Sequence, residues 1–186
     1  LSRIPGMYLL CGKVRFAQLF RLLQQRQPQR YDFIPHTAIV PDDPDADVQR
    51  VLAKGYGILK PDEGTQGDGI YIVNNLEEIK RRMGFTHVES AVVQSYIKRP
   101  MLLDGHKFDM RVYVLILSLE PLRVFLCHEG LVRVCSIQYE EPSKQNLHRK
   151  ASHLTNYTLN KTNELYEHND DPSNGARGTK RNLQST

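Results

Sequence analysis

Residues 57–73 read GILKPDEGTQGDGIYIV, where two short apolar runs flank a loop with three glycines, Gly64, Gly67 and Gly69. Glycine adopts positive φ without steric cost and lets the backbone approach a ligand closely, so this spacing predicts a strand, a flexible flap and a second strand. Backbone N–H groups of such a flap can bind phosphate oxygens, and Lys60 would place a cation beneath them. The alternative is a plain hairpin with a long glycine loop, but the sequence Lys-Pro-Asp ahead of the glycines favours a nucleotide flap.

Two familiar phosphate-binding motifs do not fit this loop. The Walker motif has its lysine after the last glycine, and the dinucleotide fingerprint opens a helix where this loop leads into another strand. We therefore expect a phosphate-binding flap that follows its lysine.

Length and composition limit the class of protein. The 186 residues, 40% hydrophobic and 25% charged, can form one sizeable core or two small ones. No apolar run approaches the roughly 20 residues that span a bilayer, and no secretory signal is recognisable, so we expect a cytosolic protein. The chain begins at Leu1 and ends in a polar run, residues 174–186, so we expect a piece of a longer protein. A net charge of +4 weakly favours acidic partners.

The three cysteines, Cys11, Cys127 and Cys135, form no C-x-x-C pair, which favours reduced thiols over a disulfide framework. Free thiols are the usual state of cysteine in a reducing compartment. Cys127 and Cys135 lie in apolar runs, and we expect both to pack in the core.

Periodicity predicts several elements outside the flap. Residues 10–27 have the three-and-four spacing of apolar side chains that is typical of an amphipathic helix, which Pro28 ends. Residues 37–40 are expected to form a short strand, and the acidic residues 42–47 a solvated loop. Asn75 predicts the cap of a short helix that reaches about Met83, and residues 88–97 form a β-prone run.

A second informative stretch begins at an expected turn, Asp104-Gly105. Lys107, Asp109 and Arg111 alternate with apolar residues and therefore project from the same face of one strand. Because charges are expensive to bury without partners, they must pair with one another, lie at an edge or face a charged ligand. Arg133 is a further cation in an apolar run.

Turn signals divide the residues that follow. Glu120-Pro121 predicts a turn into a strand at residues 122–128, and Glu129-Gly130 predicts a tight hairpin into a strand at residues 131–137. Residues 153–158 are polar, have no clear period and are expected to form a loop.

Together these segments closely resemble the tubulin-tyrosine-ligase-like family. The resemblance rests on motifs in the family's order: Lys60-Pro61-Asp62 with residues 64–70, then 94–97, Asp104-Gly105 with 107–109 and Arg111, 129–133, 153–157 and Asn160-Lys161. It extends from about Ile4 to about Gln184, which is nearly the whole chain. Members of this family are ATP-grasp ligases that join an amino acid to tubulin.

The resemblance implies the ATP-grasp fold. This fold is of the α/β (α+β) class and has mixed and antiparallel sheets with flanking helices. It assigns residues 1–50 to the end of an N-terminal domain and a linker, 51–100 to the central subdomain with the flap, and 101–186 to the start of an incomplete C-terminal subdomain. In this family ATP phosphorylates a carboxylate, and an amino group then attacks the acylphosphate. The expected cofactors are ATP and Mg²⁺, and the chemistry needs cations around the triphosphate and donors for the tetrahedral intermediate.

The resemblance also implies roles for individual residues. Phosphate or nucleotide binding is expected of Lys60, Asp68, Gly69, Lys107, Phe108, Asp109, Arg133, Thr155, Asn156 and, more weakly, Lys13. The hinge that reads adenine through its backbone, and packs it with its last two side chains, would be Gln94, Ser95, Tyr96 and Ile97. Closest to catalysis would be Lys107, Asp109 and Arg111, with Arg111 contacting the phosphate or acceptor end. The incoming amino acid would be held by Tyr157, Thr158 and Lys180, and the protein substrate would contact Gln66.

Two departures from the family pattern affect these expectations. Thr65 and Asp68 occupy flap positions where many members have cysteine and arginine, and an acid beside phosphates weakens binding unless magnesium or a cation offsets it. The family's magnesium ligands, an aspartate and a later Glu-x-Asn, are expected beyond the end of the chain. Glu167-His168-Asn169 imitates their spacing but lies in a polar loop. We therefore expect this fragment to be inactive by itself.

The segment Thr-Asn-Tyr after His-Leu resembles the family members that add glutamate, so the expected reaction is polyglutamylation of acidic tubulin tails. The expected partners are tubulin or microtubules and L-glutamate, without nucleic acid or membrane, in the cytoplasm and cytoskeleton, including the cilium, flagellum and basal body. A member that adds glycine or tyrosine, and a noncatalytic nucleotide- or microtubule-binding module, are the alternatives. An RNA-binding sheet would need exposed aromatic residues, whereas Tyr113 and Phe125 are expected in the core.

Overall fold

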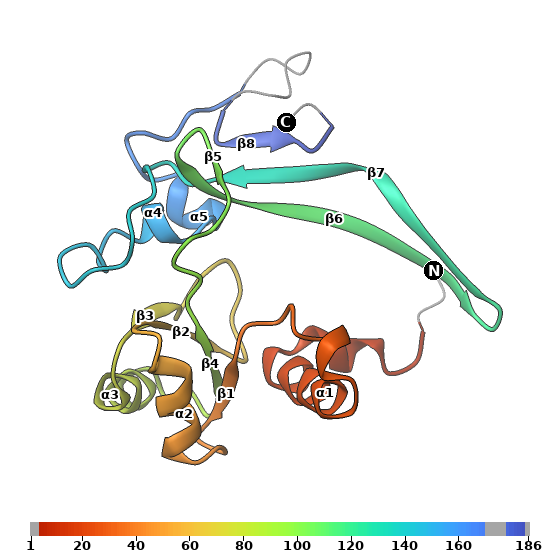
Figure 1. The fold of residues 1–186 in the computed structure, drawn as a ribbon. Coiled ribbons are helices and arrows are strands. Elements are labelled where there is room, and N and C mark those ends of the chain that lie inside the picture. The colour runs from red at the N-terminus through yellow and green to blue at the C-terminus, as the bar shows by residue number, and fades with distance from the viewer. Residues whose placement is uncertain (1–3, 170–177, 185–186) are drawn as a thin grey trace. The chain divides into compact units, whose positions relative to one another are not determined.

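The structure is a computed structural model that describes residues 4–169 and 178–184. The chain forms two compact units, residues 1–98 and 99–186, each built on its own sheet (Figure 1). Residues 37–40 belong to the sheet of the first unit, together with strands from residues 51–98. Within the described ranges, no helix has the length and apolar character needed to cross a lipid bilayer.

The first unit is a four-stranded antiparallel sheet with helices on both faces. Its strands are β1 (Thr37–Val40), β2 (Gly57–Pro61), β3 (Tyr71–Val73) and β4 (Ala91–Ser95), in the order β1-β4-β2-β3. Its helices are α1 (Lys13–Arg26), α2 (Asp45–Leu52) and α3 (Leu76–Thr86), with short 3₁₀ helices η1 (Met7–Cys11) and η2 (Pro28–Arg30).

Alternation along the strands divides the side chains between the two faces of this sheet. Val93 packs with Val48 of α2, whereas its neighbour Val92 packs with Val14 of α1. Lys60 pairs directly with Val92, and directly opposed residues share a face. The Lys60 side chain therefore lies on the α1 face of the sheet.

Three of the expected elements are confirmed in this unit. α1 ends before Pro28, residues 37–40 form β1, and Asn75 caps α3 by accepting a hydrogen bond from the Glu78 N–H at 2.8 Å. The expected solvated loop at residues 42–47 is wrong, because the Asp43 side chain is only 10% exposed and pairs with Arg21, and because Asp45 and Asp47 form the first turn of α2. Carboxylates there stabilise the positive end of the helix dipole.

Strand, glycine loop and strand follow one another at residues 57–73, as expected. β2 and β3 pair antiparallel, and the loop joins them. Gly64, Gly67 and Gly69 have φ angles of 104°, 91° and 66°, which lie in the left-handed region that favours glycine. A Cβ atom on Gly69 would also lie 2.7 Å from Pro61 Cγ, so the loop folds closely against the end of its first strand.

The second unit is built on a long hairpin. Its antiparallel sheet has the order β5-β6-β7-β8, with β5 (Leu102–Leu103), β6 (His106–Leu119), β7 (Leu122–Val134) and β8 (Lys180–Asn182). The one-turn helices are α4 (Lys150–His153) and α5 (Tyr157–Asn160), so the expected loop at residues 153–158 is wrong at its two ends, His153 and Tyr157-Thr158. The turns at Asp104-Gly105 and Glu120-Pro121 are confirmed, and Asp104 and Gly105 have φ angles of 53° and 79°.

The expected hairpin at Glu129-Gly130 is wrong, because both residues lie inside β7. Gly130 pairs with Val112 of β6, and its carbonyl oxygen accepts a hydrogen bond from the Leu183 N–H at 3.1 Å. A Cβ atom on Gly130 would lie 2.7 Å from the Arg111 carbonyl oxygen and 2.8 Å from Leu183 Cδ2. Gly130 is therefore needed because neighbouring chain segments approach it closely. A glycine of this kind looks the same in the sequence as a glycine in a turn.

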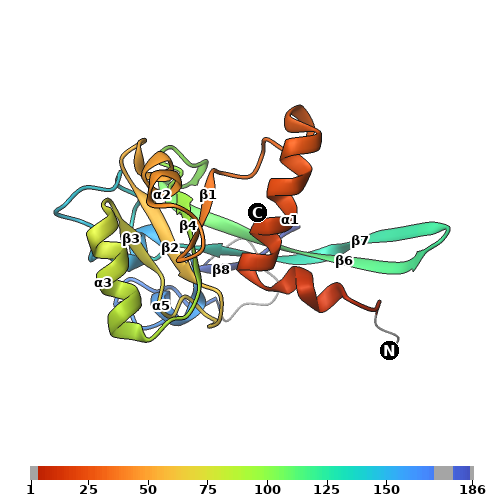
Figure 2. The same ribbon diagram turned by 90° about the horizontal axis from the view of Figure 1, so that it is seen from below.

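The distal part of β6 and β7 is a two-stranded ribbon, since β5 and β8 pair only with the base of the hairpin (Figure 1 and Figure 2). Most apolar side chains of this ribbon are exposed. Tyr113 and Phe125 are 47% and 53% exposed, and Cys127 is exposed, so the expectation that these residues pack in the core is wrong. Cys135, at the base, is buried as expected. Apolar side chains occur on both faces of the ribbon. A strand with one face on a core and the other in water would instead alternate apolar and polar residues.

Candidate functional site

A cavity of about 330 Å³ lies on the α1 face of the first unit's sheet. Lys13, Lys60 and Gln94, three of the residues expected to bind nucleotide, line it together with Thr37 and Val92. Lys60 and Gln94 come from the neighbouring strands β2 and β4, and Lys13 is the first residue of α1. Two ammonium groups at one concave surface attract anions such as phosphate.

Hydrogen bonds hold Lys60 and Gln94 in this cavity. The Lys60 ammonium donates to Gln94 Oε1 at 2.8 Å, and Gln94 Nε2 donates to Thr37 Oγ1 at 2.9 Å. The Thr37 hydroxyl donates to the Pro35 carbonyl oxygen at 2.8 Å. The three bonds form one chain from β2, through β4, to the start of β1.

Lys13 joins the base of the flap to α1. Its ammonium donates to the carbonyl oxygens of Asp62 at 3.0 Å and Gly64 at 3.4 Å. The Asp62 carboxylate accepts a hydrogen bond from the Val14 N–H at 2.8 Å, and so satisfies one of the N–H groups that lack helical partners in the first turn of α1. The first residues of the flap are therefore held through both backbone and side chain.

The flap residues Gln66, Asp68 and Gly69 lie in a turn-rich loop. The Asp68 N–H donates to the Thr65 carbonyl oxygen at 3.1 Å, and Gln66 has a positive φ of 60°. The Asp68 side chain is exposed. Contact of Asp68 and Gly69 with nucleotide, and of Gln66 with the protein substrate, stays a prediction.

The other expected hinge residues, Ser95, Tyr96 and Ile97, do not line the cavity that contains Lys60 and Gln94. The Ser95 hydroxyl donates to the Val51 carbonyl oxygen at 3.0 Å, which places it on the face of the sheet opposite Gln94. The backbone N–H groups of Ser95 and Tyr96 both donate within the unit, Tyr96 is buried, and Ile97 is 55% exposed. These three residues line a second cavity, of about 520 Å³. Their role in reading adenine stays a prediction.

In the second unit, three of the expected residues form a row across the sheet. Asp109 of β6 pairs with Arg133 of β7, which pairs with Lys180 of β8, so their side chains share one face. Arg133 Nε and Nη2 donate to the two Asp109 carboxylate oxygens at 2.8 and 2.7 Å. Thr155 also donates its hydroxyl to Asp109. The bidentate pair fixes the plane of the guanidinium group, and Lys180 is exposed beside it.

Lys107 and Arg111 share this face with Asp109, as the alternation predicts. Burial lowers the pKa of Lys107, whereas Arg111 is exposed. Burial also raises the pKa of the neighbouring Cys135 thiol to about 12. Phe108, expected at the nucleotide, lies on the opposite face of β6.

Asn160 has no role assigned from the sequence, yet it holds the segment that contains Thr155. Its Nδ2 group donates to the Leu154 carbonyl oxygen at 2.8 Å, and its Oδ1 accepts from the Ser136 N–H at 2.8 Å and hydroxyl at 3.0 Å. Asn160 is 1% exposed. A buried asparagine in a polar segment gives no periodic signal, so the motif Asn160-Lys161 marked the residue in the sequence but only tertiary contacts show what it does. The expected residues Asn156, Tyr157 and Thr158 lie at the start of α5.

No group of three or more metal-ligand side chains occurs in the part of the chain that the structure describes. Asp109 is already bound by Arg133 and Thr155. These residues therefore offer Mg²⁺ no complete ligand set, and the location of its ligands stays a prediction.

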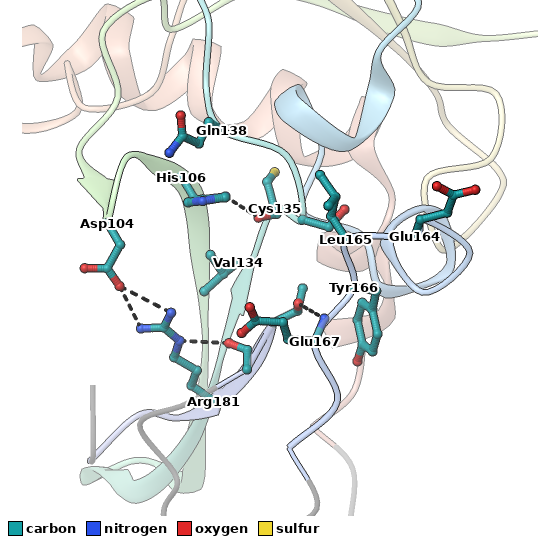
Figure 3. A pocket seen from close by; sticks show the side chains of 13 residues that line it. Asp104, His106, Val134, Cys135, Gln138, Glu164, Leu165, Tyr166, Glu167 and Arg181 are labelled. Atoms are coloured by element: carbon teal, nitrogen blue, oxygen red, sulfur yellow. Dashed lines mark hydrogen bonds and ion pairs between the residues drawn. The ribbon is translucent and has the colours of Figure 1, made fainter.

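Glu167, in the segment that imitates the magnesium motif, belongs to a different surface. Its N–H donates to Thr179 Oγ1 at 3.0 Å, and it lines a cavity of about 700 Å³ with Arg181 and His106 (Figure 3). Arg181 pairs with Val132, so this cavity lies on the sheet face opposite Asp109.

Comparison with known proteins agrees with the resemblance. The family model described as "Tubulin-tyrosine ligase family" matches residues 1–186. The chain is 39% identical over 186 residues to tubulin polyglutamylase TTLL11 of Mus musculus, an alignment that covers 96% of this chain and 25% of that protein. It is 41% identical over 189 residues to tubulin polyglutamylase TTLL13 of Homo sapiens, covering 100% of this chain and 22% of that protein. With tubulin polyglutamylase TTLL7 of Xenopus tropicalis the identity is 35%, and 99% and 20% are covered.

The chain thus spans a quarter or less of the length of these relatives. The matched range nevertheless includes all the motifs, from the glycine flap to residues 153–161. The two antiparallel sheets with few helices are consistent with part of an ATP-grasp domain. The chain belongs to the tubulin-tyrosine ligase family.

Proposed function

We propose that the protein containing this chain is an ATP-dependent carboxylate–amine ligase that adds L-glutamate to glutamate side chains of tubulin tails. The observation that supports this most is the cavity lined by Lys13, Lys60 and Gln94, because it lies at the base of the glycine flap. The names of the relatives, all tubulin polyglutamylases, support tubulin as the acceptor and the cytoskeleton as the place of action. A net charge of +4 suits an acidic tail.

In the proposed reaction, the γ-phosphoryl group of ATP is transferred to the side-chain carboxylate of the acceptor glutamate, which gives ADP and an acylphosphate. The amino group of the incoming glutamate then attacks the carbonyl carbon. The nitrogen loses a proton, the bond from carbon to the phosphate oxygen breaks, and inorganic phosphate leaves as the amide forms.

The residues of this chain would supply charge and orientation to that reaction. Lys60 and the backbone N–H groups of the flap would hold phosphate oxygens. Arg133, oriented by Asp109, and Arg111 would stabilise negative charge that develops on the phosphoryl group and on the tetrahedral intermediate. Lys180 would bind the carboxylate of the incoming amino acid.

Incorporation of labelled glutamate into microtubules by the full-length protein, with ATP and Mg²⁺, tests this proposal. We expect Lys60→Ala to reduce incorporation about 100-fold at ATP concentrations below KM, since it removes a charged donor that holds the phosphates of ATP. Lys80→Ala is the matched control, because Lys80 is exposed and pairs with Asp45 at 2.8 Å on the surface. Tight microtubule binding without incorporation would overturn the ligase in favour of a noncatalytic module. Competition among glutamate, glycine and tyrosine identifies the amino acid, and preferential transfer of glycine or tyrosine would overturn the choice of glutamate.

A further inference from the structure

We infer that Thr37 is a positioning residue of the nucleotide cavity: its hydroxyl fixes the orientation of the Gln94 amide, which in turn orients the Lys60 ammonium. The inference rests on the proposed function, which assigns ATP binding to this cavity. It concerns a residue outside every motif, at the first position of β1.

The direction of the hydrogen-bond chain is set at its far end. Pro35 offers only a carbonyl oxygen, so the Thr37 hydroxyl must donate to it, across 2.8 Å. The Thr37 oxygen is then the acceptor for Gln94, and the amide nitrogen is the group that must face it, at 2.9 Å. Gln94 Oε1 consequently faces Lys60, at 2.8 Å.

The position of Thr37 allows this control. Gln94 pairs with Thr37 on one side and with Ile58 on the other, so it stands between β1 and β2. Thr37, Lys60 and Gln94 all line the same cavity. A reversed Gln94 amide would set its NH₂ group against the Lys60 ammonium, two donors facing each other, and the ammonium would have to move away.

Loss of the Thr37 hydroxyl would leave the charge of Lys60 in place but its direction less defined. The effect should therefore fall on the binding of ATP, equally before and during phosphoryl transfer, and such uniform binding changes KM without changing kcat. A residue that merely supports the fold would instead lower the amount of active protein and so the apparent kcat.

Thr37→Val removes the hydroxyl and keeps the β-branched shape. In the full-length protein we expect KM for ATP to rise about fivefold to tenfold, the effect of one hydrogen bond of ordinary strength, with kcat within about twofold. Thr37→Ser, which keeps a hydroxyl, should restore the wild-type KM, and Thr37→Ala should show the same rise as Thr37→Val. Thr162→Val, at an exposed threonine, is the matched control.

The Gln94 side-chain amide gives a second readout that does not depend on catalysis. In NMR spectra of the 186-residue chain without nucleotide, we expect the Gln94 NH₂ protons to exchange with water about fivefold to tenfold faster in Thr37→Val than in wild type or Thr37→Ser. Equal exchange rates in all three, or an unchanged KM in Thr37→Val, would overturn the role of Thr37. If exchange changes as expected but the wild-type protein binds no ATP, the role of Thr37 in orienting Gln94 stands and the proposed function fails.

Discussion

Asp109 is the acceptor on which several hydrogen bonds of the second unit converge. Two bonds come from the Arg133 guanidinium and one from the Thr155 hydroxyl. We expect Asp109→Asn to lower the free energy of unfolding by about 1–3 kcal/mol, because an NH₂ group would replace an oxygen that faces donors. Urea unfolding measures this loss.

Glu140→Gln is the matched control for that change. Glu140 and Arg149 are separated by 3.6 Å and both side chains are more than half exposed, so their ion pair contributes little. Equal losses of stability in the two variants would contradict a special position for Asp109.

The thiols of the chain should differ in reactivity. Burial raises the pKa of Cys135 from an ordinary 9.0 to about 12, whereas Cys11 and Cys127 are exposed. We expect a chromogenic disulfide reagent at about pH 8 to label two thiols in the native chain and all three in urea, because the thiolate is the reactive form. Three rapidly labelled thiols in the native chain would contradict this prediction.

The same shift makes the stability of the second unit depend on pH. The unfolded thiol of Cys135 releases its proton near pH 9.0, and the folded one only near about 12. Between these values the native state holds more protons than the unfolded state, so the Cys135 contribution destabilises the fold as the pH rises. Cys135→Ala should remove this part of the pH dependence and leave two thiols to be labelled under both conditions.

At the scale of residues, the sequence predicts faces better than partners. Alternation placed Lys107, Asp109 and Arg111 on one face, because side-chain direction in a strand is local. That Asp109 pairs with Arg133 depends on the register of β6 and β7, which is a tertiary property. For the same reason no local pattern identified Thr37, whose contacts come from neighbouring strands and a preceding loop.

α3 offers two substitutions with opposite expected effects in one element. Asn75→Ala removes the cap that accepts from the Glu78 N–H, and should cost about 1 kcal/mol. Gly84→Ala should stabilise the helix by about 0.5–1 kcal/mol, since a Cβ atom on Gly84 would meet nothing within 4 Å. Urea unfolding followed by circular dichroism measures both. Changes of the same sign in the two variants would contradict the assignment of cap and helix interior.

Polar substitutions in the distal ribbon of β6 and β7 should change the stability of the fold less than polar substitutions at the base of β7. Leu126 is 68% exposed, so we expect Leu126→Glu to change the free energy of unfolding by less than about 0.5 kcal/mol and to reduce binding of a hydrophobic dye. Val132 is 2% exposed in the same strand, and Val132→Glu should unfold the second unit by burying a charge. Equal tolerance at both positions would contradict the difference in burial.

At the scale of elements, caps and turns that depend on a few neighbouring residues could be predicted from the sequence. Elements whose sequence pattern has two structural explanations could not. The Asn75 cap and the turn at Glu120-Pro121 were predicted because their hydrogen bonds and dihedral angles are local. Glu129-Gly130 misled because a glycine needed for close packing of strands has the sequence appearance of a turn. The one-turn helices α4 and α5 are too short to show a period.

At the scale of the whole molecule, the family and the fold class could be predicted from the motifs, whereas the order of the strands in each sheet could not. The motifs lie on strands and loops of both units, and each can be recognised from a few consecutive residues. The sheet of the first unit joins β1 to strands that follow it by more than a helix. Such pairing is non-local, so the sequence pattern alone does not predict the order of the strands.

The core of the first unit predicts that residues 1–98 fold by themselves. Val48, Val73 and Val93 are each 0% exposed in one cluster between the sheet and the helices α2 and α3. A unit with its own buried core is expected to unfold cooperatively, and Asn75→Ala should destabilise it by the same amount, about 1 kcal/mol, as in the whole chain. Val93→Asp should abolish the transition, because it buries a charge in that cluster. Urea unfolding of the polypeptide 1–98 decides this: a gradual, noncooperative profile would mean that the cluster is insufficient to form the sheet that holds Lys60, Gln94 and Thr37 in register.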